Sequence, residues 1–143
     1  MRAIALSCGI GILACAALIA DTHDDVVDLF ASMAAALSEI NVPQFMDAFD
    51  REMPDYDKLK GAVTALVNQA EVSSSVEPLK DEGDDTKRTV ELDWFLEIRS
   101  LLPDGPVVHR REVIQCELRK EKKRWKIVSI KPLEFFGAAK LDQ

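Results

Sequence analysis

The predicted fold of this chain is decided by the stretch Thr89-Val90-Glu91-Leu92-Asp93-Trp94-Phe95-Leu96-Glu97-Ile98-Arg99. Every second residue from Val90 to Ile98 is apolar, which places five large side chains on one face of a β-strand. Charged side chains and Phe95 fall on the opposite face. An apolar face of this size needs a covering layer, and the helical patterns upstream supply one.

The composition indicates one globular domain with an acidic body. The chain has 143 residues, of which 48% are hydrophobic and 30% are charged, and its net charge is -7. Residues 21–99 carry 19 acidic and 7 basic side chains, whereas residues 100–143 carry 10 basic and 6 acidic ones. Because an acidic body repels phosphate at long range, we expect no nucleic-acid partner.

Residues 1–20 have the pattern of a secretory signal peptide. Arg2 is followed by an apolar run that ends in small residues at Ala20, and a strongly acidic stretch comes next. We expect cleavage after Ala20, or after Ala16 or Ala17. This would leave a single domain over residues 21–143, without a membrane span, in the periplasm or secreted from a bacterium.

Two alternatives to cleavage stay open for this leader. The run is near the lower length limit for a membrane span, so it could be a retained anchor. The segment Ile12-Leu13-Ala14-Cys15 also resembles a lipoprotein lipobox, with lipid attached at Cys15, although Leu13 stands where a small residue is usual. If the leader is removed, Cys116 is the one cysteine left, so the domain has no intrachain disulfide and must be stable through its core.

Three helices are predicted before any strand. The first has a stripe at helical spacing, made of Val26, Phe30, Met33 and Leu37. Asn41 is a good cap for a second, Phe-rich helix that runs through Phe49 and ends at Pro54. Asp55 caps a third, whose apolar side consists of Tyr56, Leu59, Val63, Leu66 and Val67.

Four strands follow. Residues 71–77 are extended but polar, with Pro78 near their end, which favours an edge strand. The four carboxylates in residues 81–85 do not have calcium-loop spacing, so we expect a solvated acidic turn and no metal site. Residues 107–120 and 124–131 form the last two strands, and the basic cluster 119–126 is interpreted as a solvated hairpin. Leu133, Phe135 and Phe136 are expected to fold back onto the core, and the chain to fray from Gly137 onwards.

The predicted fold class is therefore α+β, with three N-terminal helices packed on a curved four-stranded antiparallel meander. Helix 1, the connection Glu39-Ile40-Asn41-Val42-Pro43-Gln44-Phe45 and the closing strand Arg124-Trp125-Lys126-Ile127-Val128-Ser129-Ile130 resemble the nuclear transport factor 2-like superfamily, the cystatin-like α+β cone. The resemblance covers roughly residues 24–136 and rests on element order.

The resemblance implies a cone-shaped cavity between the first helix and the sheet. The pocket-lining candidates are mainly apolar: Phe30, Phe45, Phe49, Tyr56, Trp94, Leu96 and Ile114. Some members of the superfamily are isomerases, cyclases or dehydratases, and many are non-catalytic binding or dimerisation modules.

Catalysis is disfavoured by the residues available. Isomerase-like members use a carboxylate base with a tyrosine donor, but the first helix has no tyrosine and Asp93 lies opposite Trp94 unless a bulge reverses the face. Dehydratase-type members use a His and Asp pair, and neither His23 nor His109 matches that motif. We therefore assign no catalytic residue and no cofactor.

The favoured function is a non-catalytic binding or interaction domain, and the alternative is a small-molecule isomerase, cyclase or dehydratase-like enzyme that uses the same cavity. A small apolar ligand in the cone is one possible partner. A homodimer through the outer sheet face is another, since Phe95 and Val113 lie there among charges.

Overall fold

The first helix begins at the start of the described chain. The structure is a computed structural model that describes residues 22–141, so the predicted signal peptide, the cleavage site and Cys15 lie outside the described residues. Within this range the first helix runs over residues 22–38. Its predicted stripe is confirmed, because Val26, Phe30, Met33 and Leu37 are all at most 2% exposed.

The second helix is shorter than predicted. α2 (Val42–Met46) begins as expected, with the Asn41 side chain accepting a hydrogen bond from the Gln44 backbone N–H at 3.1 Å. It stops at Met46, so the prediction that Phe49 lies in this helix is wrong. The backbone there finds partners in the last strand instead: Asp50 N–H donates to the Ile127 carbonyl and Ile127 N–H to that of Ala48, each at 2.9 Å.

The third helix, α3 (Tyr56–Gln69), buries the predicted apolar side. Leu59, Val63 and Leu66 are fully buried. Asp55 occupies the N-cap position but its side chain makes no capping hydrogen bond. The helices therefore supply the covering layer that the alternating strand requires.

The sheet is the predicted meander. β1 (Ala70–Gly83), β2 (Lys87–Ser100), β3 (Val107–Glu121) and β4 (Arg124–Lys131) pair antiparallel in the order β1-β2-β3-β4. β1 is an edge strand, as expected, but it continues past Pro78 to Gly83 through a register shift between Pro78 and Lys80. An edge strand tolerates this proline because one side of its backbone needs no ladder partner.

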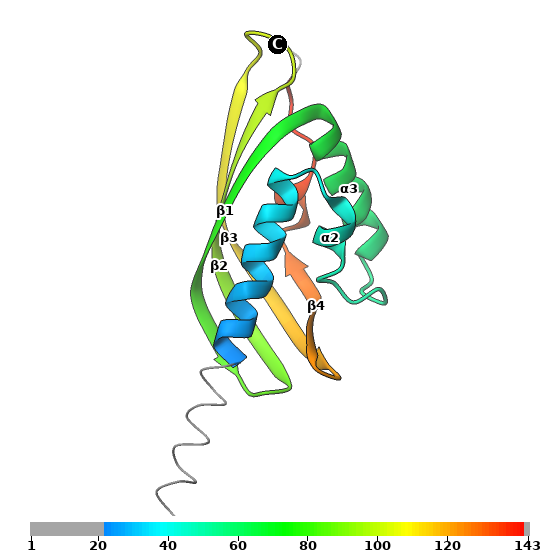
Figure 1. Cartoon of the computed structure of the whole chain (residues 1–143), viewed down its shortest axis with the longest axis vertical. Helices are drawn as coiled ribbons and strands as arrows, with labels where there is room; N and C mark the ends of the chain where they lie inside the picture. Colours follow the sequence, from blue (N-terminus) through cyan, green and yellow to red (C-terminus); the bar gives the residue numbers. More distant parts are fainter. Residues whose placement is uncertain (1–21, 142–143) are drawn as a thin grey trace, which may run out of the picture.

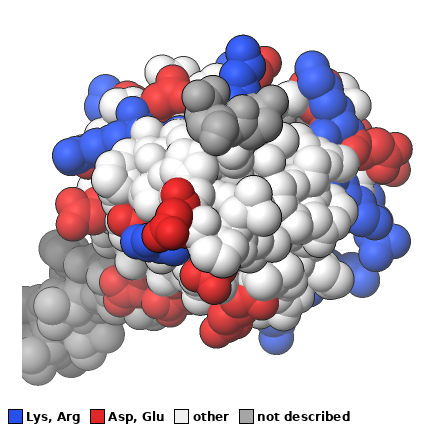
Figure 2. All heavy atoms as spheres, turned by 90° about the horizontal axis from the view of Figure 1, so that it is seen from above, with Lys and Arg blue, Asp and Glu red and all other residues white. Residues whose placement is uncertain are grey.

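The strands curve around the first helix, and all helices lie on the same side of the sheet (Figure 1). The alternation of β2 is confirmed, since Val90, Leu92, Trp94, Leu96 and Ile98 are at most 1% exposed. A second register shift, between Glu117 and Leu118, allows both Ile127 and Ile130 of β4 to face the core. Seen from above, the molecule has a broad area with few charged side chains, with charged residues around it (Figure 2).

The C-terminal segment is held to the body. The short helix η1 (Leu133–Phe136) buries Phe135 and Phe136 as predicted. The prediction that the chain frays from Gly137 is wrong for the next residues, because Arg110 donates hydrogen bonds to the carbonyls of Phe135, Gly137 and Ala138 at 2.6–2.9 Å. None of the helices in residues 22–141 is long and apolar enough to cross a bilayer.

Candidate functional site

The space between the first helix and the sheet is occupied by aromatic rings. The indole of Trp94 meets Phe30 of the first helix edge-on at 6.3 Å and Phe136 of η1 edge-on at 5.0 Å, measured between ring centroids. Phe136 contacts Phe45 at 5.6 Å, and Phe45 contacts Phe49 at 5.4 Å. We call these five residues the aromatic cluster; each is at most 2% exposed.

Six of the seven predicted lining residues are therefore in the hydrophobic core. Leu96 and Ile114 are fully buried on the same side of the sheet as Trp94. The seventh, Tyr56, is half-buried and packs against the core from the start of α3. Whether any of these side chains binds a ligand stays a prediction.

Sequence reasoning missed two contacts that complete this interior. Phe136 was expected in the core, but its position against Trp94 depends on how η1 folds back. Ser74, on the inner side of β1, accepts a hydrogen bond from Trp94 Nε1 at 2.8 Å. The one polar atom of the indole is thus satisfied within the protein, and no ligand is needed to pair it.

Asp93 lies on the outer face of the sheet. Arg111 of β3 donates two hydrogen bonds to its carboxylate, from Nε at 3.0 Å and from Nη2 at 2.6 Å. This hydrogen-bonded pairing holds the pKa of Asp93 below its usual value. The alternative in which a bulge turns Asp93 inward is therefore wrong, because the register from Val90 to Arg99 is uninterrupted against β3.

The rest of the outer face is crossed by ion pairs within the chain. Glu97 of β2 contacts His109 at 3.2 Å and Arg99 at 3.6 Å, and Glu91 contacts Lys80 at 3.7 Å. Phe95 packs against the His109 ring at 5.5 Å between centroids. His109 is an exposed surface residue, as expected.

A hollow of about 590 Å³ opens between the α2–α3 connection and the β3–β4 hairpin. Apolar and charged side chains both line it: Pro43, Met46, Asp47, Phe49, Asp50, Arg51, Glu52, Tyr56, Lys60, Glu121 and Lys126. Arg124 holds the Asp47 carboxylate at 2.5 Å and lowers its pKa by that hydrogen bond. Phe49 and Tyr56 therefore belong to a surface hollow as well as to the core boundary.

Two carboxyl groups meet in this hollow. The side chains of Asp50 and Glu121 share a hydrogen bond, which raises the pKa of Glu121. The pKa of Asp50 is lowered, first by the Glu52 backbone N–H, which donates to its carboxylate at 2.8 Å, and then by Glu121. Both side chains face solvent, so the pair is a surface feature.

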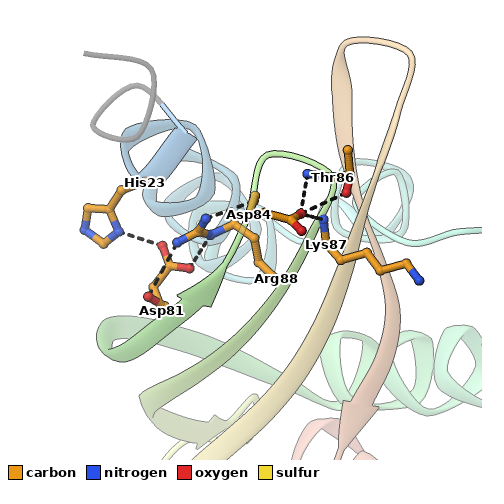
Figure 3. Close-up of polar contacts among 6 residues, drawn as sticks. All are labelled: His23, Asp81, Asp84, Thr86, Lys87 and Arg88. Carbon is orange, nitrogen blue, oxygen red and sulfur yellow. Dashed lines mark hydrogen bonds and ion pairs between the residues drawn. The ribbon is translucent and has the colours of Figure 1, made fainter. Parts of the chain in front are cut away.

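A second polar cluster ties the first helix to the β1–β2 hairpin (Figure 3). The Asp81 carboxylate lies 2.6 Å from His23 Nδ1 through one oxygen and 2.5 Å from Arg88 Nε through the other. The side chains of Asp81 and Arg88 are only 5% and 7% exposed, whereas His23 is 48% exposed. The guanidinium also donates to the carbonyl of Asp84 at 3.0 Å.

The prediction of a solvated acidic turn over residues 81–85 is wrong for Asp81, because Arg88 and the start of the first helix cover it. Asp84 does lie in the turn, where its carboxylate accepts from the N–H groups of Thr86 and Lys87 and from the Thr86 hydroxyl, each at 2.8 Å. These bonds lower the pKa of Asp84 to about 2. Within residues 22–141 no group of three or more His, Cys, Asp or Glu side chains could hold a metal ion.

Cys116 is buried on the inner side of β3, as predicted. Burial strongly raises the pKa of its thiol, so the reactive thiolate is disfavoured. The arrangement offers a packed apolar interior, a charged surface hollow that reaches Phe49 of the aromatic cluster, and a buried ion pair.

Comparison with known proteins shows the fold. No family model and no curated protein matches the sequence. A putative scytalone dehydratase from Novosphingobium aromaticivorans matches with a TM-score of 0.67 at 12% identity, over 78% of this chain and 85% of that protein. A nuclear transport factor 2-like protein of unknown function from Shewanella oneidensis matches with a TM-score of 0.58 at 13% identity, over 76% and 95%.

A hexachlorocyclohexane dehydrochlorinase from Novosphingobium barchaimii is similar to the same degree, with a TM-score of 0.63 at 9% identity over 79% of this chain and 86% of that protein. At these identities the likeness concerns the fold alone. The predicted α+β cone of the nuclear transport factor 2-like, or cystatin-like, type is confirmed.

Proposed function

We propose that this chain is a non-catalytic interaction domain that acts through its outer surface. The observation that carries the proposal is the aromatic cluster, in which Trp94 and Phe136 are both fully buried. A pocket for a small organic molecule occupies about 300–1,000 Å³. Opening such a volume beside Trp94 would require several aromatic rings to leave the core, which costs the packing energy of each ring.

Export belongs to the same proposal. The apolar run after Arg2 and the acidic stretch that follows it support a signal peptide over residues 1–20. The intact mass of the protein recovered from its native envelope tests this point. A mass that begins at Asp21, Ala17 or Leu18 supports it, and a retained leader or a lipidated Cys15 overturns it.

A dehydratase-like or isomerase-like enzyme is the second candidate, and one contact favours it. His23 and Asp81 lie 2.6 Å apart, which is the type of pair that a proton-transfer enzyme uses. Against this role, Arg88 Nε contacts the same Asp81 carboxylate at 2.5 Å, so this carboxylate is already engaged in an ion pair within the chain. The pair also links the first helix to the β1–β2 hairpin, and this structural role is enough to explain the contact without catalysis.

The test is a titration of the native protein with benzene and with indole. Binding is monitored through the NMR signal of the Trp94 indole N–H. We expect no chemical-shift change in the native protein, because the rings of Phe30 and Phe136 pack against Trp94. The control is Phe136→Ala, which removes one ring beside Trp94 and should create a dry apolar cavity that binds benzene. A Trp125→Phe variant assigns the signal.

If Phe136→Ala does not fold, Phe136→Leu serves as the control, since it removes less volume. Saturable binding to the native protein, with a shift of the Trp94 signal, would overturn the proposal and favour a ligand-binding or enzymatic function of the cone.

A further inference from the structure

The end of the molecule that carries the β2–β3 hairpin has an unusual surface. Figure 1 shows this hairpin at the top, and Figure 2, seen from above, shows a broad area with few charged side chains. Leu101 and Leu102 in the hairpin are 59% and 70% exposed, and Val107 is 40% exposed. In a chain that is 30% charged, exposed apolar side chains gathered at one end that carries few charges indicate an interaction surface.

The hairpin tip, Leu101 to Pro106, is a fixed loop. Ser100 N–H donates to the Pro106 carbonyl and Gly105 N–H to the Leu102 carbonyl, each at 3.0 Å. Leu102 N–H donates to Ser100 Oγ at 3.1 Å. A Cβ atom at Gly105 would lie 2.5 Å from that same oxygen, so glycine is required for this loop. The two leucines are thus presented in a set conformation, which lowers the entropy cost of binding.

A shallow groove of about 470 Å³ lies beside the tip. It is lined by Gln69, Ser100, Leu101, Leu102, Ala139, Lys140 and Leu141. Its far wall is fixed by a reciprocal pair of hydrogen bonds, from Gln69 Nε2 to the Ala139 carbonyl at 3.0 Å and from Ala139 N–H to Gln69 Oε1 at 2.6 Å. A protruding apolar tip and an apolar groove therefore share one surface.

The charges of the tip and the groove are opposite. Asp104 is the only charged residue in the tip, and Lys140 is the only charged one among the described residues that line the groove. A two-fold symmetric contact requires such self-complementarity, since each copy offers the same patch to the other. Two copies with a net charge of -7 also repel least where they approach through a surface that carries few charges.

We propose that this end of the domain binds a second copy of the chain. In the dimer the Leu101–Leu102 tip of each copy covers the groove of the other, and Asp104 of one copy pairs with Lys140 of its partner. This inference rests on the proposed function, because it names the partner of the interaction domain.

Sedimentation velocity over a wide range of protein concentrations tests the dimer. The purified protein should dimerise, and Leu102→Asp should weaken the dimer about a hundredfold by placing a charge in the apolar contact. Val113→Asp is the matched control, because Val113 is an exposed valine on the outer face of β3 and its substitution should leave the dimer unchanged. Circular dichroism of each variant establishes that it is folded.

Charge reversal tests the proposed pair. Asp104→Lys and Lys140→Glu should each weaken the dimer about tenfold, and the double variant should restore most of the loss. A monomer at every concentration overturns the inference. A dimer that Val113→Asp abolishes and Leu102→Asp does not would assign the contact to the outer sheet face, which also overturns it. Neither result bears on the filled interior, which the benzene and indole titration decides separately.

Discussion

The ring of Phe136 packs edge-on against the indole of Trp94, with 5.0 Å between centroids and 85° between the planes. The two residues are far apart in the sequence, one in the middle of β2 and the other in the short helix η1 after the last strand. A segment that follows the sheet in sequence therefore contributes one of the rings that pack against Trp94 in the interior of the cone.

Phe136→Ala should lower the free energy of unfolding by about 3–5 kcal/mol, because it removes a fully buried ring and leaves a cavity. Urea denaturation measures this change. Phe95→Ala on the outer face is the control and should cost about 1 kcal/mol or less, since that ring is only half-buried. Equal losses in the two variants would show that Phe136 does not pack as described.

The ion pair of Asp81 and Arg88 should behave as a buried pair. Asp81→Asn leaves a buried guanidinium without its countercharge and should cost about 3–5 kcal/mol. The double variant Asp81→Leu/Arg88→Met should cost less than the sum of its single variants, because no unpaired charge remains. His23→Ala should cost less than about 1 kcal/mol, since that side chain is half exposed. If the stability losses of the two single variants simply add up in the double variant, the pairing of Asp81 with Arg88 is contradicted.

The turn residue Asp84 gives a dependence of stability on pH. Its pKa is lowered from 3.8 to about 2 by hydrogen bonds from the folded backbone, so the folded state favours the ionised carboxylate. The stabilisation is present above pH 3.8 and is lost as the pH falls toward 2. Asp84→Ala should therefore lower the urea midpoint above pH 3.8, and the difference should shrink toward pH 2. A constant difference across this range would contradict the assignment.

Gly83 should tolerate no side chain. Its φ of 138° is disfavoured for other residues, and a Cβ atom there would overlap the carbonyl oxygen of Lys87. Gly83→Ala should cost about 1–3 kcal/mol or more. The control is Gly61→Ala in the interior of α3, where an added Cβ atom would meet nothing within 4 Å. This substitution should stabilise the helix by about 0.5–1 kcal/mol, because alanine has a higher helix propensity than glycine. Thermal unfolding compares the two, and a destabilised Gly61→Ala with a neutral Gly83→Ala would refute both assignments.

Local periodicity was sufficient to predict the element types and their order. The alternation around Trp94 identified the inner face of β2, and the spacing from Val26 to Leu37 identified the buried stripe of the first helix. Both patterns reflect which side of one element is covered, and each can be recognised without knowing the partner. The order of three helices and four strands then limited the fold to an α+β meander.

Contacts between distant segments account for the wrong predictions. α2 ends early because the backbone around Phe49 pairs with Ile127, and no local signal encodes that bridge. Asp81 is buried because His23 and Arg88 converge on it from two different elements. The pocket-lining prediction stays open, because the residues that line a cone are the same apolar types that fill one, and the contact of Phe136 with Trp94 depends on how η1 folds back.

The measurement that tests the filled interior most directly is a crystal structure of the purified protein under xenon pressure. Xenon occupies dry apolar cavities, so it reports empty space between the first helix and the sheet. We predict no xenon site beside Trp94 in the native protein and one site beside it in Phe136→Ala. Xenon or a co-purified molecule next to Trp94 in the native protein would contradict a filled interior. It would then favour a ligand-binding or enzymatic function inside the cone.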